Sequence, residues 1–256
     1  YLLNNYHFIM DNGSKVILEP GARLRLTESS FTGCDQMWEG VSVHANAHLS
    51  AANSMIEDAQ YAVCVKTGGG VRAHNTDFEN NNFGIRTEPG GTKAILLGNR
   101  FSTTGSGLKP AYAGQSPAPL GKGFAGVYLE DAGSVNIDID PFTGANNLFS
   151  NLKYGIIAKN TELNVRSATF EDIVQVPKGD GYTAFVGGQT GKAIYTEKGV
   201  TWVNKENATP VSFSNCHTGV ETIGTTAYVL DTDMDDMVNG NMTTNRDFCN
   251  HLYNTI

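Results

Sequence analysis

The stretch Val71–Arg86 reads VRAHNTDFENNNFGIR, and its apolar anchors Val71, Phe78 and Ile85 follow one another at intervals of seven residues. Val63 lies eight residues upstream of Val71, so one full cycle from Val63 to Ile85 takes 22 residues. Short alternating apolar segments separated by Gly or Asn are typical of strands joined by tight corners. The stretch therefore predicts three short strands in each cycle.

The same cycle recurs along most of the chain. Matching offsets define about eight coils, which begin near Leu24, Leu49, Val71, Ala94, Val135, Leu163, Trp202 and Ala227. A period near twenty residues with three strands indicates a solenoid, because one coil cannot bury its own apolar side and must stack on its neighbours. The fold class that we expect is all-β, a single-stranded parallel β-helix with a period near 22 residues.

Stacking in parallel places equivalent side chains about 4.8 Å apart, so the repeat also predicts columns of side chains. One inward apolar column contains Phe31, Ile56, Phe78, Phe101, Phe149, Phe170, Phe213 and Met234. A polar corner column, three residues earlier in each coil, contains Asn53, Asn75 and Asn146. An inward Asn at a corner bonds backbone groups of its own and the neighbouring coil.

The repeat divides the chain into three parts. We expect residues 1–13 to be a lead-in or cap, residues 14–240 to be the β-helix, and residues 241–256 to be an extension or the start of a further coil. Because the chain starts at Tyr1 and not at Met, we expect it to be part of a larger chain or assembly.

Composition argues against two classes of partner. A net charge of −8 and a pI near 5.2 disfavour nucleic acid and acidic membrane surfaces. The sequence has no run of eighteen apolar residues, so we expect no insertion into a membrane.

Insertions interrupt the period after the Phe column. The two longest cover residues 102–123 and 172–191, a third lies around Phe142, and a short one precedes Gly40. We expect all four to leave from the same corner, since each is placed between the Phe column and the Gly corner. Insertions gathered on one side of a repeat protein are often its binding face.

An outward column should run beside this corner. Alternation assigns to it Ser42, Cys64, Arg86, Tyr128, Ile157, Tyr195 and Glu221. Either the long loops fold over its apolar members and form a satellite core, or the rings stay open as a platform for sugars or a partner. The candidate ligand-binding residues are Tyr128, Tyr195, Arg86, Lys109, Tyr112, Tyr182 and Gln189.

Asp138 and Asp140, in the segment NIDIDP, are the candidate catalytic carboxylates. Alternation points both to the same side, and two close carboxylates can bind Ca²⁺ or split their pKa values. The segment lacks the Gly and distal Glu of a Ca²⁺ loop. Solvated outward positions are the structural alternative, and we expect no metal site and no other cofactor.

The four cysteines, Cys34, Cys64, Cys216 and Cys249, have no CxxC spacing. Their even number is compatible with disulfides, and buried free thiols are the alternative. Cys34 and Cys216 are six coils apart in the register and cannot pair. Sequence distance permits Cys34 with Cys64 and Cys216 with Cys249.

The segments SFTGC (30–34), NSMIEDAQYAV (53–63), NTDFENNNFGI (75–85) and ATFEDI (168–173) resemble the repeats of right-handed parallel β-helix proteins. VILEPGARLRL (16–26) resembles the first coil of large secreted bacterial surface proteins of this fold, including cargo of type IX secretion. The resemblance implies a right-handed solenoid and an extracellular or cell-surface location.

This group contains polysaccharide lyases and hydrolases as well as adhesins and stalks. The catalytic motifs of pectate lyases and polygalacturonases are not found in this sequence. We therefore expect a module for adhesion, for glycan or protein binding, or for scaffolding. The alternative is a polysaccharide lyase or glycoside hydrolase that uses Asp138 and Asp140 in a groove beside Tyr128 and Tyr195.

Overall fold

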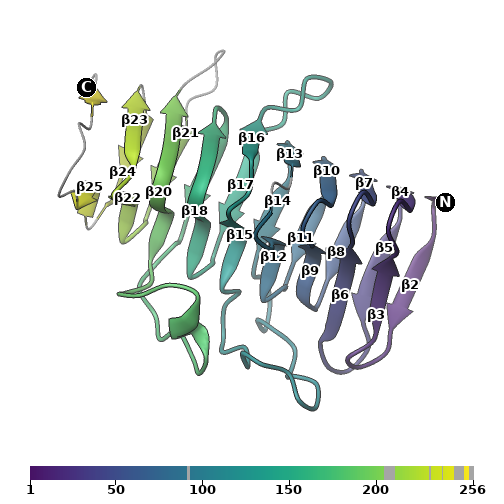
Figure 1. The fold of residues 1–256 in the computed structure, drawn as a ribbon. Coiled ribbons are helices and arrows are strands. Elements are labelled where there is room, and N and C mark those ends of the chain that lie inside the picture. The colour runs from purple at the N-terminus through teal and green to yellow at the C-terminus, as the bar shows by residue number, and fades with distance from the viewer. Residues whose placement is uncertain (91–92, 205–210, 231, 238, 245–250, 254–256) are drawn as a thin grey trace.

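The computed structural model describes residues 1–90, 93–204, 211–230, 232–237, 239–244 and 251–253. Its strands wind into a solenoid with three faces, and all pairings between neighbouring coils are parallel (Figure 1). The one helix among the described residues is the 3-10 turn η1, Tyr182–Ala184. The predicted all-β parallel solenoid is therefore confirmed. No helix of the described part of the chain is long and apolar enough to span a membrane.

The three faces are three ladders of strands. Face 1 consists of β3 (Lys15–Leu18), β6 (Trp38–Val43), β9 (Ala59–Val65), β12 (Phe83–Thr87), β15 (Ala125–Glu130), the first halves of β18 (Tyr154–Val165) and β20 (Lys192–Asn204), β22 (Thr218–Ile223) and β25 (Asn239–Thr244). Face 2 consists of β1 (Leu2–Asn4), β4 (Arg23–Thr27), β7 (His48–Ala52), β10 (Gly70–His74), β13 (Lys93–Leu97), β16 (Ser134–Asp138), the second halves of β18 and β20, β23 (Thr226–Leu230) and β26 (His251–Tyr253). Face 3 consists of β2 (His7–Met10), β5 (Ser30–Gly33), β8 (Met55–Glu57), β11 (Asp77–Glu79), β14 (Arg100–Ser102), β17 (Asn147–Ser150), β19 (Ala168–Glu171), β21 (Val211–Ser214) and β24 (Thr232–Asp235).

The inward column of face 3 is as predicted from Phe31 to Met234. Each predicted member pairs with the next, and Phe8 extends the column by one coil at the N-terminal end. The rings stack nearly in parallel, with centroids 4.7 Å apart for Phe78 and Phe101 and 4.9 Å apart for Phe101 and Phe149. Face 3 therefore has nine strands among the described residues, one coil more than the eight predicted.

The polar corner column lies one residue later than predicted. The buried position is held by Ser29, Ser54, Thr76, Asn99 and Asn147. Asn99, for example, donates its backbone N–H to Asn147 Oδ1 at 3.0 Å. Asn53 and Asn75 lie outside it with φ of 48° and 44°, and they bond to each other at 2.9 Å. Asn is favoured there because it tolerates the left-handed backbone of the corner.

One coil departs from the predicted register at Trp202. Inward Leu163 pairs with Thr201, and Thr201 with Ala227, so the buried residue is Thr201 and Trp202 points outward. The reason is the corner, because β18 and β20 run through it without a break. Ile194 and Thr201 are seven residues apart, whereas Val63 and Val71 are eight.

The insertions leave from two corners. Residues 103–124, between β14 and β15, and 172–191, between β19 and β20, leave the corner between faces 3 and 1. The insertion that carries Phe142 lies between β16 and β17, at the corner between faces 2 and 3, so its predicted position was wrong. Figure 1 shows it at the opposite end of the coils from the two long loops. Phe149 takes the column position, and the extra residues therefore come before it.

Residues 1–13 contain β1 and β2, which pair with β4 and β5. An apolar cavity of about 600 Å³ opens at this end of the solenoid, lined by side chains such as Leu3, Phe8 and Val16. Within residues 241–256, the described strands are the end of β25 and β26.

Replacing Phe149 by Ala should lower the free energy of unfolding by about 3 to 5 kcal/mol, because loss of the ring leaves a cavity between its two stacked neighbours. Phe142→Ala, at a side chain that is 81% exposed, is the matched control and should change it by less than about 0.5 kcal/mol. Urea denaturation of both variants measures the difference. Equal losses would contradict the assignment of Phe149 to the column.

Candidate functional site

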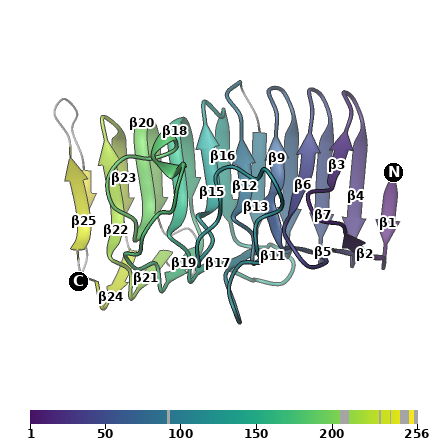
Figure 2. The same ribbon diagram turned by 90° about the horizontal axis from the view of Figure 1, so that it is seen from below.

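The corner between faces 3 and 1 carries the two long loops, which lie over the outer side of face 1. The outward column of face 1 follows the predicted order from Ser42 to Glu221. Viewed from below, the loops 103–124 and 172–191 cross in front of the strands of face 1 (Figure 2).

A second apolar cluster forms between this column and the loops. It consists of Phe83, Phe124, Ala125, Tyr128, Tyr154, Ile157, Tyr182, Val186 and Tyr195, with Tyr61 and Phe185 packed against it. Tyr128 and Tyr195 are only 1% and 2% exposed. Of the two predicted alternatives, the structure has the covered one, so these rings form a satellite core and no open platform.

The polar ends of the buried tyrosines are all bonded. Tyr128 Oη donates to Glu130 Oε2 at 3.1 Å, and Tyr195 Oη donates to Glu197. Tyr182 Oη donates to Asn82 Oδ1 at 2.7 Å. Burial raises the pKa of all three phenols, and the neighbouring carboxylates raise those of Tyr128 and Tyr195 further. These hydroxyls therefore act as hydrogen-bond donors that fasten the cluster.

The loop 103–124 is fastened to the early coils by Lys109. Its Nζ lies 2.8 Å from Asp58 Oδ2 and donates to the carbonyl oxygens of Gly33 and Cys34 at 2.6 and 2.8 Å. Asp58 is nearly fully buried, and burial raises its pKa although Lys109 opposes the shift. The ion pair ties the loop to a carboxylate two coils away from its own strand.

Tyr112 is the second anchor of the same loop. Its hydroxyl bonds to the amide of Gln60, and Gln60 Nε2 donates to the Ser116 carbonyl at 2.9 Å. Burial raises the pKa of Tyr112 to about 12. Lys109 and Tyr112, both predicted as ligand-binding residues, thus lie in contacts that hold the loop down.

The loop 172–191 is held mainly through backbone carbonyls. Tyr154 Oη donates to the Gln189 carbonyl, and the buried Lys153 donates to the Lys178 carbonyl, both at 2.8 Å. Burial lowers the pKa of Lys153 to about 8. The Gln189 side chain lines an open pocket of about 550 Å³ within this loop, together with Gln175, Lys178 and Thr190.

Arg86 closes the edge of the satellite core. Its guanidinium carbon lies 4.9 Å from the centre of the Tyr61 ring and 5.2 Å from that of Phe185. A guanidinium between two rings is a favourable cation–π arrangement. Beside it, a small pocket of about 80 Å³ also touches Cys64 and Lys66.

Asp138 and Asp140 lie at the other corner, away from Tyr128 and Tyr195, so the predicted shared groove was wrong. Asp138 faces Arg166, with 3.6 Å between Oδ2 and Nη1. Asp140 is fully buried, and its Oδ1 lies 2.8 Å from His74 Nε2. The Asp140 carboxylate also accepts from Phe142 N–H at 2.8 Å and from Thr143 Oγ1 at 2.6 Å.

These bonds decide the charge of Asp140. Burial alone would raise its pKa, but the hydrogen bonds from Thr143, Phe142 and His74 lower it to about 2. Asp140 therefore organises the short loop 139–146 as a carboxylate at neutral pH.

Cys34, Cys64 and Cys216 are free thiols, so of the two alternatives the structure has free thiols for these three, and the Cys34–Cys64 disulfide that sequence distance permitted is not formed. Cys34 follows β5 at the end of face 3, whereas Cys64 lies on the outer side of face 1. Cys216 is buried, and burial raises its pKa to about 11. Cys249 lies outside the described residues. In the described part of the chain, no three His, Cys, Asp or Glu side chains are grouped as metal ligands.

Two features of the surface were not found from the sequence. The first is a row of charges beside the satellite core, where Glu130 pairs in register with Lys159 and Lys159 with Glu197. Lys159 Nζ lies 3.9 Å from Glu197 Oε2 and also donates to the Phe185 carbonyl. Each residue lies two positions after a member of the outward column, so the same alternation could have found them.

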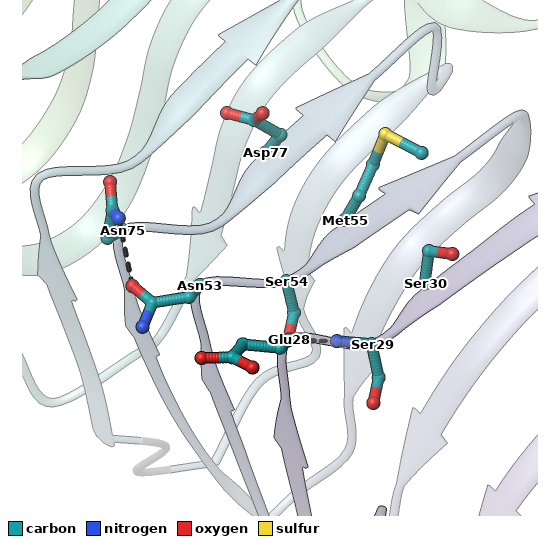
Figure 3. A pocket seen from close by; sticks show the side chains of 8 residues that line it. All are labelled: Glu28, Ser29, Ser30, Asn53, Ser54, Met55, Asn75 and Asp77. Atoms are coloured by element: carbon teal, nitrogen blue, oxygen red, sulfur yellow. Dashed lines mark hydrogen bonds between the residues drawn. The ribbon is translucent and has the colours of Figure 1, made fainter. Parts of the chain in front are cut away.

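The second is a polar groove of about 410 Å³ at the corner between faces 2 and 3 (Figure 3). It is lined by Glu28, Ser29, Ser30, Asn53, Ser54, Met55, Asn75 and Asp77. The same positions of three successive coils supply these residues, and Figure 3 shows the bond between Asn75 and Asn53 along the groove. Asp77 is held by Arg100 at 3.1 Å. The groove offers amides and hydroxyls to a polar ligand.

The fold and these sites define a class, the parallel β-solenoids with insertion loops. A family model described as "right handed beta helix region" matches residues 5–229, so the chain belongs to the right-handed β-helix family. Comparison with curated proteins gives no match.

Lys109→Met should loosen the loop 103–124, because it leaves the buried Asp58 without its cation. We expect local opening of the loop to become easier by about 1 to 3 kcal/mol. Limited chymotrypsin digestion should cut this loop faster in the variant than in the wild type. Lys122→Met, in the same loop, is the control. Equal cutting rates in all three proteins would contradict the anchor.

Because of Asp140, the free energy of unfolding should decrease at acidic pH. Its folded pKa is about 2, below the value near 3.9 of an unfolded aspartate, so its contribution is complete above pH ~4 and lost as the pH falls to about 2. That contribution is about 2 kcal/mol. Urea denaturation between pH 7 and pH 2 should show Asp140→Asn less stable at neutral pH and approaching the wild type in acid. A constant difference would contradict the assignment.

Proposed function

We propose that this chain is a non-catalytic β-helix module of a secreted or cell-surface protein, which binds glycan or protein or serves as a scaffold. The observation that carries the proposal is the closure of the insertion corner. The two loops that could have walled a substrate groove instead pack on Tyr128, Ile157 and Tyr195 as a second core. A rigid, covered corner suits a scaffold better than a catalytic cleft.

The positions of the carboxylates support the same proposal. Hydrolysis or elimination on a sugar chain needs acid and base groups that converge on one bond. Asp138 and Asp140 instead face Arg166 and His74, and Asp140 is fully buried. Glu130 and Glu197 accept bonds from buried tyrosines and are separated along the face by Lys159.

The extracellular or cell-surface location, including type IX secretion, stays a prediction based on the resemblance of the first coil. The acidic charge of −8 supports partners other than nucleic acid and acidic membranes. Polar surfaces such as the groove at Asn53 and Asn75 suit hydroxyl-rich or peptide ligands.

A polysaccharide screen tests the proposal. Incubation with neutral and acidic polysaccharides should yield no new reducing ends and no absorbance of unsaturated uronates. Turnover that Asp138→Ala or Asp140→Asn abolishes, in a variant that still folds by circular dichroism, would establish the enzymatic alternative. Turnover that both variants retain would also reject the non-catalytic proposal and would point to other carboxylates.

A further inference from the structure

Face 2 carries a row of partly exposed aromatic and amide side chains. No loop of the described chain packs an apolar cluster over this row. Its outward column runs in register through Asn136, Asn164, Trp202 and Tyr228. The Trp202 and Tyr228 rings stack with centroids 3.9 Å apart and an interplanar angle of 9°. Aromatic rings stacked on adjacent rungs of an outward column form a rigid element that stands above the sheet.

The side of this stack formed by Trp202 faces polar side chains. Since one face of the Trp202 indole lies against Tyr228, its other face turns toward the rung of Asn164. Asn164 and Asn136 are shorter side chains, so the indole rises above them as the wall of a shelf. Both amides are partly exposed.

Charged and polar groups border the shelf. In the orientation that satisfies its amide, Asn164 Oδ1 accepts from Arg166 Nη2 and Nε at 3.1 and 3.2 Å. Arg166 also faces Asp138 at 3.6 Å, so its charge is balanced. Glu162 lies exposed on the other side of Asn164. The shelf therefore combines one flat apolar wall with hydrogen-bond donors and acceptors and no excess positive charge.

We infer that this shelf, with Trp202 as its wall, binds a neutral polysaccharide. The flat apolar face of a pyranose ring fits the indole, which gives contact area at little entropic cost, and sugar hydroxyls fit the amides of Asn164 and Asn136. The net charge of −8 and the balanced Arg166 disfavour a polyuronate. A polymer fits better than a single sugar, because the column continues from Asn136 to the exposed Ile95 on the next rung.

This inference rests on the proposed function in one respect, since it treats the glycan as a ligand and not as a substrate. The two fail separately. Turnover of a polysaccharide rejects the non-catalytic proposal, whereas the role of Trp202 is decided by binding alone.

Affinity electrophoresis through gels that contain hydroxyethylcellulose, xylan, galactomannan or polygalacturonate tests the shelf. The wild type should be retarded by at least one neutral polymer. Trp202→Ala should weaken that binding roughly tenfold or more, while Trp202→Phe keeps most of it. Phe142→Ala removes an exposed aromatic side chain away from face 2 and is the control, which should bind as the wild type does. Thermal melts confirm that each variant folds.

Fluorescence gives an independent readout. The chain has two tryptophans, and Trp38 is fully buried, so an emission change on adding the retarding polymer reports Trp202. The change should disappear in Trp202→Phe. Three results would overturn the inference: no retardation by any neutral polymer, equal binding by folded Trp202→Ala, or retardation by polygalacturonate alone.

Discussion

The whole structure depends on one constraint, the parallel stacking of each coil on the last at a single strand spacing. Stacking repeats every inward side chain as a column, and it holds the phenylalanine rings of face 3 at about the same distance as the strands, 4.7 to 5.1 Å. Each ring is buried between its neighbours above and below and against the inward side chains of the other faces. Extra residues that lengthen a coil must therefore project outward from the stack, and they can do so only at a corner.

The corners meet this demand in different ways. Left-handed residues such as Asn53 and Asn75 turn the chain, while the buried Ser, Thr and Asn one position later bond the backbone across coils. At the corner between faces 1 and 2, β18 and β20 bend without a break around Asn160 and Lys198, whose φ values are 46° and 59°. That shorter corner is the reason that Trp202 points outward.

The long loops cover the apolar outward column of face 1. Tyr128, Ile157 and Tyr195 would otherwise form an exposed apolar stripe, which proteins rarely leave open. The loops bury this stripe and are themselves tied down by the ion pair of Lys109 with Asp58. Face 2 has the opposite arrangement, since its aromatic residues, Trp202 and Tyr228, are stacked and partly exposed beside polar amides.

The amino-acid pattern alone predicts the solenoid, the face 3 column from Phe31 to Met234, and the outward order from Ser42 to Glu221. It could do so because alternation within a strand and the length of the uninserted coils are local properties. Features that depend on contacts between distant segments could be read only from the folded chain. Whether loops cover Tyr128 depends on anchors such as Asp58, and the choice between Phe142 and Phe149 depends on which ring fits between Phe101 and Phe170. Trp202 points outward because the corner before it is one residue shorter than the corner between Val63 and Val71. The apolar character of Trp202 could not reveal this, since an apolar residue at that place suits an inward position equally well.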